Sequence, residues 1–396
     1  MLQRLLIISH VVHYQHDGLL SAYGPYAREI DMWAGLFPEI VIAAPLRRES
    51  RPGDALPFRA SNVSMAPQFE TGGNRRFSKV VQLAAVPLHL WRLGRAMWDA
   101  DAIQVRCPGN LGLLGCLLAP CFMKPRAAKY AGQWSNYDGE ALTYRLQKTL
   151  LRSRWWKAPV LVYGEWSGQP PHIVPFFASI MGEAQMTRAR SAELRDWTKR
   201  PLEVLFVGRL SEAKNVDVII RAVAQLQAEG EWVRLRVVGD GPMRAALESL
   251  ARELEIGDQV IFEGAVPQAK VLNFFEQGDV LVLVSQTEGW PKAIAEAMAF
   301  GLVCIGSERG LVPQMLGDGR GLLVEPRDVQ ALTGALRSVL RNPSRAEEIS
   351  KRAAAWSQQF TLERFRDALR EELESAWKVS LPARTTDKHA VAKAET

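Results

Sequence analysis

The chain has 396 residues, of which 47% are hydrophobic and 23% are charged, a composition that excludes a disordered polypeptide and supports large cores. Its length favours two or three domains over a single core. No stretch reaches the roughly 18 consecutive apolar residues of a membrane-spanning helix, and the opening "MLQRLLIISH" is too short an apolar run for a signal peptide.

The two halves of the chain differ in charge. Residues 1–200 carry 25 Lys and Arg against 15 Asp and Glu, whereas the remainder carries 24 against 28. A basic half favours a polyanion, an anionic lipid surface or an acidic substrate as partner, and a solvated surface explains so small an excess equally well. The four cysteines form no C-x-x-C pair, which indicates buried, reduced thiols in a cytoplasmic protein.

Strand-like apolar runs alternate with helical patterns in the first half, and this alternation predicts α/β units around a parallel sheet. A helix is predicted at 26–37, after Pro25, and another at 111–122. The proline-rich stretch 168–177 is expected to cross to the second half. Strands are predicted at 4–9, 39–45, 101–108, 126–134 and 159–164.

The same rhythm restarts after a charged stretch at 187–201. Strands are predicted at 202–210, 233–241, 259–266, 279–285, 302–307 and 321–326, and helices at 215–230, 242–254, 269–278 and 291–301. We therefore expect an N-terminal domain over 1–178, a C-terminal domain over 200–343, helices over 344–378 and a disordered tail over 379–396.

Three histidines follow the first predicted strand at a strict interval of three, in "SHVVHYQHDG". They are His10, His13 and His16, with Asp17 directly after them. A metal site, an acid/base site and a polar loop all suit such a cluster. A spacing of three in a loop does not bring ligands together on one ion, so we interpret the stretch as a loop at the edge of a site.

Two cations follow the strand at 202–210. Arg209 ends this strand and Lys214 comes five residues later, where a helix begins. Free N–H groups and the dipole of a helix start add to side-chain charge, so this pattern suits a diphosphate. Solvated loop cations are the alternative.

A Gly-Asp-Gly turn in "VVGDGPMRAAL" resembles a dinucleotide-binding loop but departs from it. The G-x-G-x-x-G pattern requires glycine at position 244, where Arg244 stands. We therefore interpret the turn as structural, with Pro242 at the first position of the next helix.

Two carboxylates in "SQTEGWPKAIAEAMAFG" are the sharpest signal. Glu288 lies in the loop after the strand at 279–285, and Glu296 lies eight positions later in the following helix. Carboxylates accept hydrogen bonds from vicinal hydroxyls, so one can hold a sugar and the other a ribose. Two glutamates without a shared task are the alternative, which the small-residue helix around Glu296 disfavours.

The order of these motifs resembles the retaining glycosyltransferases of family 4, the glycosyl transferases group 1 type. The resemblance covers about residues 203–330 densely, through G-R-L…K, V-G-D-G-P, F-x-G-x-V, S-x-x-E-G-x-P-x-x-x-x-E-A-M-A-x-G and G-L-L-V-x-P. It implies the α/β GT-B fold, with two facing Rossmann-like domains, a central cleft and C-terminal crossing helices that return to the N-terminal domain. It also implies that the N-terminal domain binds the acceptor and the C-terminal domain binds the nucleotide sugar.

The resemblance also implies roles for individual residues. Arg209 and Lys214 bind the donor diphosphate and stabilise the leaving nucleotide, where negative charge develops. Glu288 lies near the donor sugar and Glu296 binds the ribose hydroxyls. Backbone at Gly289, Trp290 and Pro291 meets sugar hydroxyls or phosphate, and the strand end at Ala265 and Val266 meets the nucleobase. No metal and no cofactor are expected.

The N-terminal half departs from the family pattern. Members commonly have a glycine-rich loop after the first strand, where this chain has a long aromatic loop with only Gly18 and Gly24. Members also commonly place a histidine after a middle strand, close to the reacting sugar, whereas this chain has Arg106 and Asn110 there. His16, His13 and Asp138 are the candidates for the missing polar contact. We assign the catalytic role to His16 and a place in an acceptor-side or cleft loop to His13, Gly18 and Asp138.

Two basic stretches with tryptophans, at 144–159 and 75–98, suit amphipathic helices on an anionic membrane surface. The alternative is a helix that covers the core and turns a solvent-exposed basic face outward. The first stretch has its cations at Arg145, Lys148, Arg152, Arg154 and Lys157.

Together these features predict a retaining glycosyltransferase that moves a sugar from a nucleoside diphosphate donor to a glycan or lipid-linked acceptor. Bacterial surface polysaccharide assembly, in the cytoplasm or on the inner face of the cell membrane, is the expected setting, and no nucleic acid is expected as partner. A GT-B-fold nucleotide-sugar epimerase is the alternative. Arg244 disfavours a third reading, a dehydrogenase.

Overall fold

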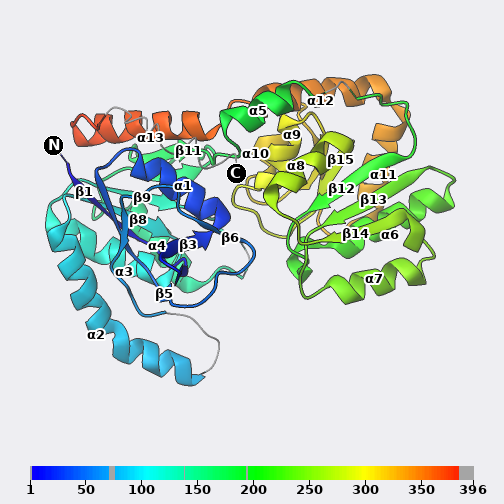
Figure 1. Ribbon diagram of the computed structural model, residues 1–396. Helices are drawn as coiled ribbons and strands as arrows, with labels where there is room; N and C mark the ends of the chain where they lie inside the picture. The colour runs from blue at the N-terminus through cyan, green and yellow to red at the C-terminus, as the bar shows by residue number, and fades with distance from the viewer. Residues whose placement is uncertain (1, 71–75, 138, 193–194, 383–396) are drawn as a thin grey trace. The chain divides into compact units, whose positions relative to one another are not determined.

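The computed structural model describes residues 2–70, 76–137, 139–192 and 195–382 (Figure 1). The chain divides into two compact units. Unit 1 comprises Met1–Phe177 and Leu362–Thr396, and unit 2 comprises Ala178–Thr361. The chain therefore leaves unit 1 once and returns to it once.

Unit 1 is built on a parallel seven-stranded sheet with the strand order β11-β10-β9-β8-β1-β4-β7. Its central strands are continuous apolar runs, which is typical of a sheet buried on both faces. The strands are β1 (Arg4–Ile8), β4 (Glu39–Ala43), β7 (Val63–Met65), β8 (Ala102–Cys107), β9 (Arg126–Tyr130), β10 (Val160–Tyr163) and β11 (Ile173–Phe176).

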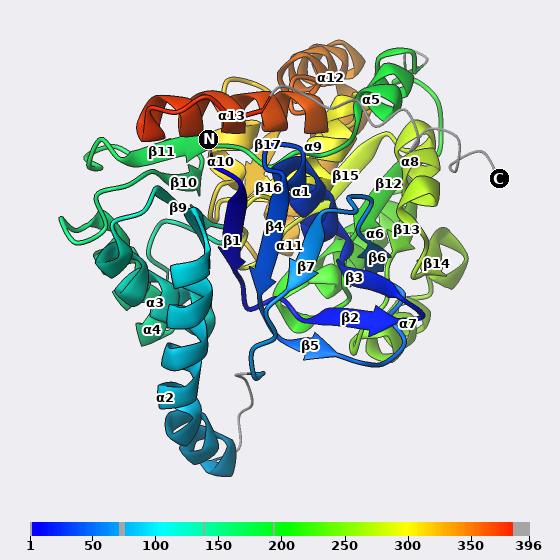
Figure 2. The same cartoon turned by 60° about the vertical axis from the view of Figure 1, so that its left-hand side comes forward.

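Helices cover both faces of this sheet. One core contains Leu93, Met97, Leu111 and Leu151 from the helices α2, α3 and α4, and the other contains Phe365 and Leu369 from α13. In Figure 2, α2 extends well beyond the sheet. The helical segments are α1 (Gly24–Ala34), α2 (Arg76–Asp99), α3 (Asn110–Leu118), the 3-10 turn η1 (Ala119–Phe122), α4 (Leu142–Arg152) and α13 (Leu362–Trp377).

The histidine-rich stretch is a β-hairpin, so the prediction of a loop is wrong. β2 (His13–His16) pairs antiparallel with β3 (Leu19–Tyr23), and the hairpin extends into a four-stranded sheet with β5 (Leu46–Arg47) and β6 (Ala55–Pro57). The turn consists of Asp17 and Gly18, with φ angles of 50° and 75°. Asp-Gly is a preferred pair for such two-residue turns because both positions need positive φ.

Unit 2 has a parallel six-stranded sheet with the order β14-β13-β12-β15-β16-β17. In chain order this is 3-2-1-4-5-6, the order of a Rossmann-like domain. The strands are β12 (Leu202–Val207), β13 (Val233–Val238), β14 (Val260–Gly264), β15 (Val280–Leu283), β16 (Val303–Ser307) and β17 (Leu322–Val324).

The helices of unit 2 confirm most of the predicted rhythm. They are α5 (Glu183–Arg190), α6 (Val216–Ala228), α7 (Arg244–Glu253), α8 (Gln268–Gln277), α9 (Lys292–Ala299), α10 (Val312–Leu316), α11 (Val329–Arg341) and α12 (Pro343–Ser357), with 3-10 turns η2 (Glu212–Lys214) and η3 (Gly257–Gln259). Pro242 precedes α7 by two positions instead of opening it.

Three other expectations need correction. The proline-rich stretch 168–177 contains the edge strand β11, whose Pro175 lies where no ladder partner is needed on the outer side. Within 344–378, only α13 belongs to unit 1, because α12 packs on α9 and α11 in unit 2. Leu381, predicted in the disordered tail, is buried in the core of unit 1, and residues 383–396 lie outside the described residues.

Candidate active site

The strand order of unit 2 creates a switch point between β12 and β15. Connections from β12 run toward β13 on one side, and those from β15 run toward β16 on the other. Loops that follow the carboxyl ends of two such strands diverge, and ligands of open α/β sheets bind there. Arg209 and Lys214 follow β12, and Glu288 follows β15, so three of the predicted site residues lie at this edge.

The structure brings Lys214 and Glu288 into direct contact. The Lys214 ammonium donates to the Glu288 carboxylate, with Nζ 2.5 Å from Oε1. Both side chains are partly exposed, at 25% and 11%. The pair therefore presents one cation and one carboxylate to solvent at the switch point. Arg209 is exposed on the loop after β12 and makes no ion pair with the described residues.

Backbone and amide contacts hold the two loops together. The Gln286 N–H donates to Ala213 O at 2.9 Å. Asn215, buried and in the left-handed conformation with φ 49°, donates from Nδ2 to Val284 O at 2.7 Å. Asparagine is the residue other than glycine that most readily takes this conformation. Asn215 therefore fixes Lys214, its neighbour, against the loop that carries Glu288.

Arg327 clamps the same loop from the end of β17. With the Gln286 amide oxygen turned toward it, Arg327 donates to that oxygen from Nε at 3.0 Å and from Nη2 at 2.7 Å. Its own φ is +67°, which is uncommon for a side chain of this size. The sequence analysis missed Asn215 and Arg327. "AKN" offered a signal for Asn215, whereas nothing in "GLLVEPR" singles out the arginine.

Glu296 lies on α9, 7% exposed, where it contacts the start of α8. Gln268, the first residue of α8, donates from Nε2 to Glu296 Oε1 at 3.2 Å. Ala265 and Val266 lie between β14 and Gln268. The structure thus brings together the carboxylate predicted to hold a ribose and the strand end predicted to meet a base.

The segment from Gly289 to Pro291 leads into α9, whose start is capped by no side chain. The Trp290 ring is stacked on Trp356, with centroids 6.1 Å apart, and lies edge-on to Phe360 at 5.2 Å. This indole packs in an aromatic cluster, and the predicted contact of the Trp290 backbone with a ligand stays a prediction. The N–H groups of the first turn of α9 favour an anion.

The Gly-Asp-Gly turn is structural. A Cβ at Gly239 lies only 1.9 Å from Gly208 O, and one at Gly241 lies 2.3 Å from Leu210 O. The glycines therefore let the ends of β12 and β13 pass closely and place Arg209 at the edge. Arg244 is paired with Glu248 at 2.8 Å at the start of α7. Arg244, held by this pair, stands at the position where a dinucleotide-binding loop needs glycine.

The structure contradicts one of the site assignments in the N-terminal half and leaves the others as predictions. His13 is fully buried, lies between the rings of Tyr26 and Phe58, and pairs through Nδ1 with Val11 O at 2.9 Å. Because no ligand reaches a core side chain, its assignment to an acceptor-side loop is wrong. His16 and Gly18 are at the hairpin tip, where His16 Nδ1 is 2.9 Å from Asp17 Oδ2. Their roles stay predictions. Asp138 lies outside the described residues.

His10 is the histidine that lies at the carboxyl end of the sheet in unit 1. It follows β1 and covers Gly109, where a Cβ lies 2.6 Å from its Nδ1. Although the His10 side chain is exposed, desolvation by the surrounding protein and then the charge of Arg106 lower its pKa to about 4. The ring is therefore neutral at physiological pH and can both donate and accept a hydrogen bond. The sequence analysis passed over His10 because spacing alone does not separate it from His13 and His16.

The basic stretch at 144–159 is less exposed than predicted. Lys148 on α4 is buried and pairs with the buried Glu140, with Nζ 2.5 Å from Oε1. Trp156 is also buried, whereas Arg154, Trp155 and Lys157 are exposed. The alternative, a helix that covers the core, therefore describes α4 better than a membrane-facing helix does.

No group of three or more His, Cys, Asp or Glu in the described part of the chain is arranged to hold a metal ion. The four cysteines are free, and three of them are buried as predicted, with Cys121 exposed.

Comparison with known proteins confirms the family resemblance for unit 2. Residues 190–356 match the family model described as Glycosyl transferases group 1. The colanic acid biosynthesis glycosyltransferase WcaL of Salmonella typhimurium is 34% identical over 148 residues, 36% of each chain. The amylovoran biosynthesis glycosyltransferase AmsK of Erwinia amylovora is 32% identical over 151 residues, 36% of this chain and 37% of AmsK. The matches thus span little more than a third of these relatives.

Comparison of structures extends over both units. The Anabaena protein Alr3699/HepE, solved in complex with UDP and glucose, aligns with 95% of this chain and 100% of its own, with a TM-score of 0.66 and 16% identity. At this identity the likeness concerns the fold. The two Rossmann-like units and this likeness confirm the predicted GT-B fold class.

Proposed function

We propose that this chain, whose residues 190–356 are those of a group 1 glycosyl transferase, transfers a sugar from a nucleoside diphosphate donor with retention of anomeric configuration. The observation that carries the proposal is the contact between Lys214 and Glu288 at the switch point of unit 2. Glu296 lies on α9, the helix that begins at Lys292, shortly after Glu288.

In the proposed reaction, bond cleavage leaves negative charge on the departing nucleoside diphosphate. Arg209, Lys214 and the N–H groups at the start of α9 are fixed positive groups that stabilise this charge as it develops. The leaving phosphate helps to deprotonate the acceptor hydroxyl, which attacks on the same face. Since cations of the chain take the role that a metal has in other transferases, the reaction is proposed to need no metal ion.

The donor and the acceptor are proposed by class. Structures of the same fold were solved with UDP, and the relatives are named for polysaccharide biosynthesis, which supports a nucleotide sugar and a glycan or lipid-linked acceptor. Bacterial surface polysaccharide assembly is the proposed setting, with the enzyme in the cytoplasm or peripheral on the inner face of the membrane. The described residues contain no helix with both the length and the apolar character needed to cross a bilayer.

The test begins with a panel of nucleotide sugars, screened by thermal shift and by hydrolysis of the donor. With the donor found, Lys214→Ala and Glu296→Ala are each expected to lower turnover by about a thousandfold, because each removes a group that contacts the donor. Lys351→Ala is the matched control, since this lysine forms an exposed pair with Glu347 on α12. EDTA should leave the rate unchanged.

Full activity of both variants would contradict the proposal. Release of an epimerised sugar with no acceptor present would instead support the epimerase alternative.

A further inference from the structure

The second half of α2 is apolar on two opposite faces. Its side chains are described from Pro87 onward, and His89, Leu93 and Met97 on one face are buried, at 1%, 0% and 0% exposed. Leu88, Trp91, Arg95 and Trp98 follow the pattern i, i+3, i+7 and i+10, which places them on the opposite face of a helix. We call these four residues the α2 stripe.

The α2 stripe is exposed. Trp91 is 69% exposed and Trp98 74%, and they are more exposed than any other tryptophan among the described residues. Leu88 is 40% exposed. Single exposed apolar side chains are ordinary on a protein surface, whereas two tryptophans and a leucine in one row on a projecting helix mark an interaction site (Figure 2).

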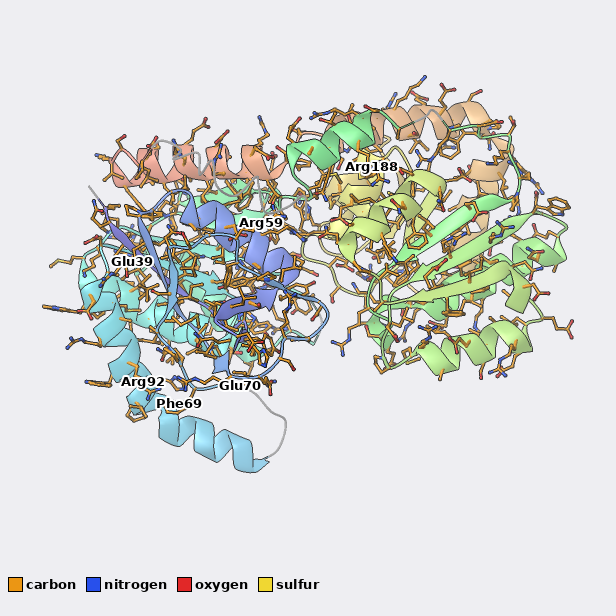
Figure 3. The ribbon with its side chains drawn as sticks, viewed as in Figure 1. Glu39, Arg59, Phe69, Glu70, Arg92 and Arg188 are labelled. Atoms are coloured by element: carbon orange, nitrogen blue, oxygen red, sulfur yellow. The ribbon has the colours of Figure 1, made fainter. Side chains whose placement is uncertain are left out.

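Arginines lie beside the apolar side chains of the α2 stripe. An open pocket of about 480 Å³ beside α2 is lined by Trp91 together with Arg4, Arg92 and Arg95. Arg4 pairs with Glu39 and Arg95 with Asp99, but Arg92 has no carboxylate partner among the described residues and lies over the Phe69 ring at 4.3 Å (Figure 3). The stripe and pocket thus combine an exposed apolar row with cationic groups.

We propose that the α2 stripe docks on an anionic lipid bilayer. Tryptophan prefers the region between headgroups and acyl chains, and arginine beside it pairs with lipid phosphates, so the two residue types on one helix face match the chemistry of that interface. Residues 1–177 carry 20 Lys and Arg against 12 Asp and Glu, which adds a long-range attraction to an anionic surface. The pocket lined by Arg4, Arg92 and Arg95 receives a lipid phosphate.

This inference deepens the membrane-peripheral setting proposed above, and it does not depend on the proposed glycosyl transfer. Of the two basic stretches predicted for a membrane surface, it selects 75–98, which contains the α2 stripe, over 144–159, where Lys148 on α4 and Trp156 beyond that helix are buried. A second copy of this chain is a different occupant for the same stripe, and the experiment separates the two.

The experiment is co-sedimentation of the full chain with two kinds of vesicle. One contains phosphatidylcholine alone, and the other contains phosphatidylcholine with about a third phosphatidylglycerol. The wild type is expected to bind the anionic vesicles and to lose binding at high salt. Trp91→Gln with Trp98→Gln is expected to weaken binding about tenfold or more, and Arg92→Gln with Arg95→Gln by a similar factor. Because Trp91, Arg95 and Trp98 are exposed and Arg92 is partly exposed, the variants should keep the wild-type circular dichroism and melting temperature.

Two matched controls sharpen the result. Trp232→Gln removes a tryptophan that is 64% exposed on unit 2, and Arg154→Gln with Lys157→Gln removes two exposed cations beyond α4. Both should bind vesicles as the wild type does. The proposal would be overturned if the tryptophan double variant bound anionic vesicles as strongly as the wild type. It would also be overturned if the wild type did not bind anionic vesicles. A wild type that forms a dimer through the stripe, without vesicle binding, would identify a second copy as the occupant instead.

Discussion

At the scale of single residues, the three histidines of one short stretch have three different environments. His10 lies at a strand end, His13 is in the core, and His16 is at a hairpin tip. Sequence spacing predicted none of these differences. In a hairpin, alternate side chains point to opposite faces, whereas the loop interpretation assumed no such alternation. What separates His13 from His16 is the hairpin closed by the Asp17–Gly18 turn, and this Asp-Gly pair is a hairpin signal in the sequence.

The buried His13 makes stability depend on pH. Burial lowers its pKa from 6.5 in the unfolded chain to about 4 in the fold. Below pH 6.5 the unfolded chain therefore binds a proton that the native chain does not, so stability falls as pH falls toward 4. The loss is about 3 kcal/mol for this residue.

Urea unfolding measured at several values between pH 7 and 4.5 tests this expectation. His13→Phe keeps a ring between Tyr26 and Phe58 and removes the titrating group, so its free energy of unfolding should change less with pH than that of the wild type. His16→Gln, at the exposed end of the same strand, should keep the wild-type slope. An unchanged slope in His13→Phe would assign the effect to other groups.

At the scale of elements, the sequence predicted the strands and helices of unit 2 well and the contacts between their loops only in part. Continuous apolar strands followed by polar residues placed Arg209, Lys214 and Glu288 at the same sheet edge. The clamp by Arg327 could not be predicted, because it joins segments 41 positions apart through one amide and follows a turn whose backbone angle no local pattern dictates.

Removal of this clamp should affect catalysis more than stability. In Arg327→Ala the loop after β15 loses the two hydrogen bonds on Gln286, so Glu288 and Lys214 are held less firmly. We expect kcat/KM to fall about 10- to 100-fold, mainly in kcat, with a small change in melting temperature. Arg327→Lys should not restore activity, because an ammonium does not reproduce the paired N–H donors.

Arg309→Ala is the control for that measurement, since Arg309 forms an exposed pair with Glu325 just before the same turn. Equal activity of Arg327→Ala and the wild type would show that the loop keeps its position without the clamp.

At the scale of the whole molecule, unit 2 is an insertion in unit 1. Its two ends are joined to each other, because Ile180 N–H donates to Phe360 O at 3.1 Å and Met181 forms a bridge with Thr361. Unit 1 in turn is completed by α13, which packs Phe365 and Leu369 into its core. Length and alternation predicted two domains, but they did not predict that the last helix pair is divided between them.

Residues 178–361 should therefore fold when produced alone. They contain a complete six-stranded sheet with their own helices, and 184 residues are enough for a stable core. A cooperative thermal transition and dispersed amide resonances would check this. The complementary chain, 1–177 joined to 362–396 by a short glycine-serine linker, tests the other unit, and aggregation of both pieces would show that each needs the other.

The paired ends of unit 2 have a consequence for how such proteins can change. A segment whose first and last residues are neighbours can be cut out at the level of the gene and replaced by another of the same kind, with the host chain interrupted at one place only, between β11 and α13. The half that is proposed to choose the donor is thus a cassette. Exchange of this cassette between relatives would combine a new sugar with an old acceptor in a single recombination event.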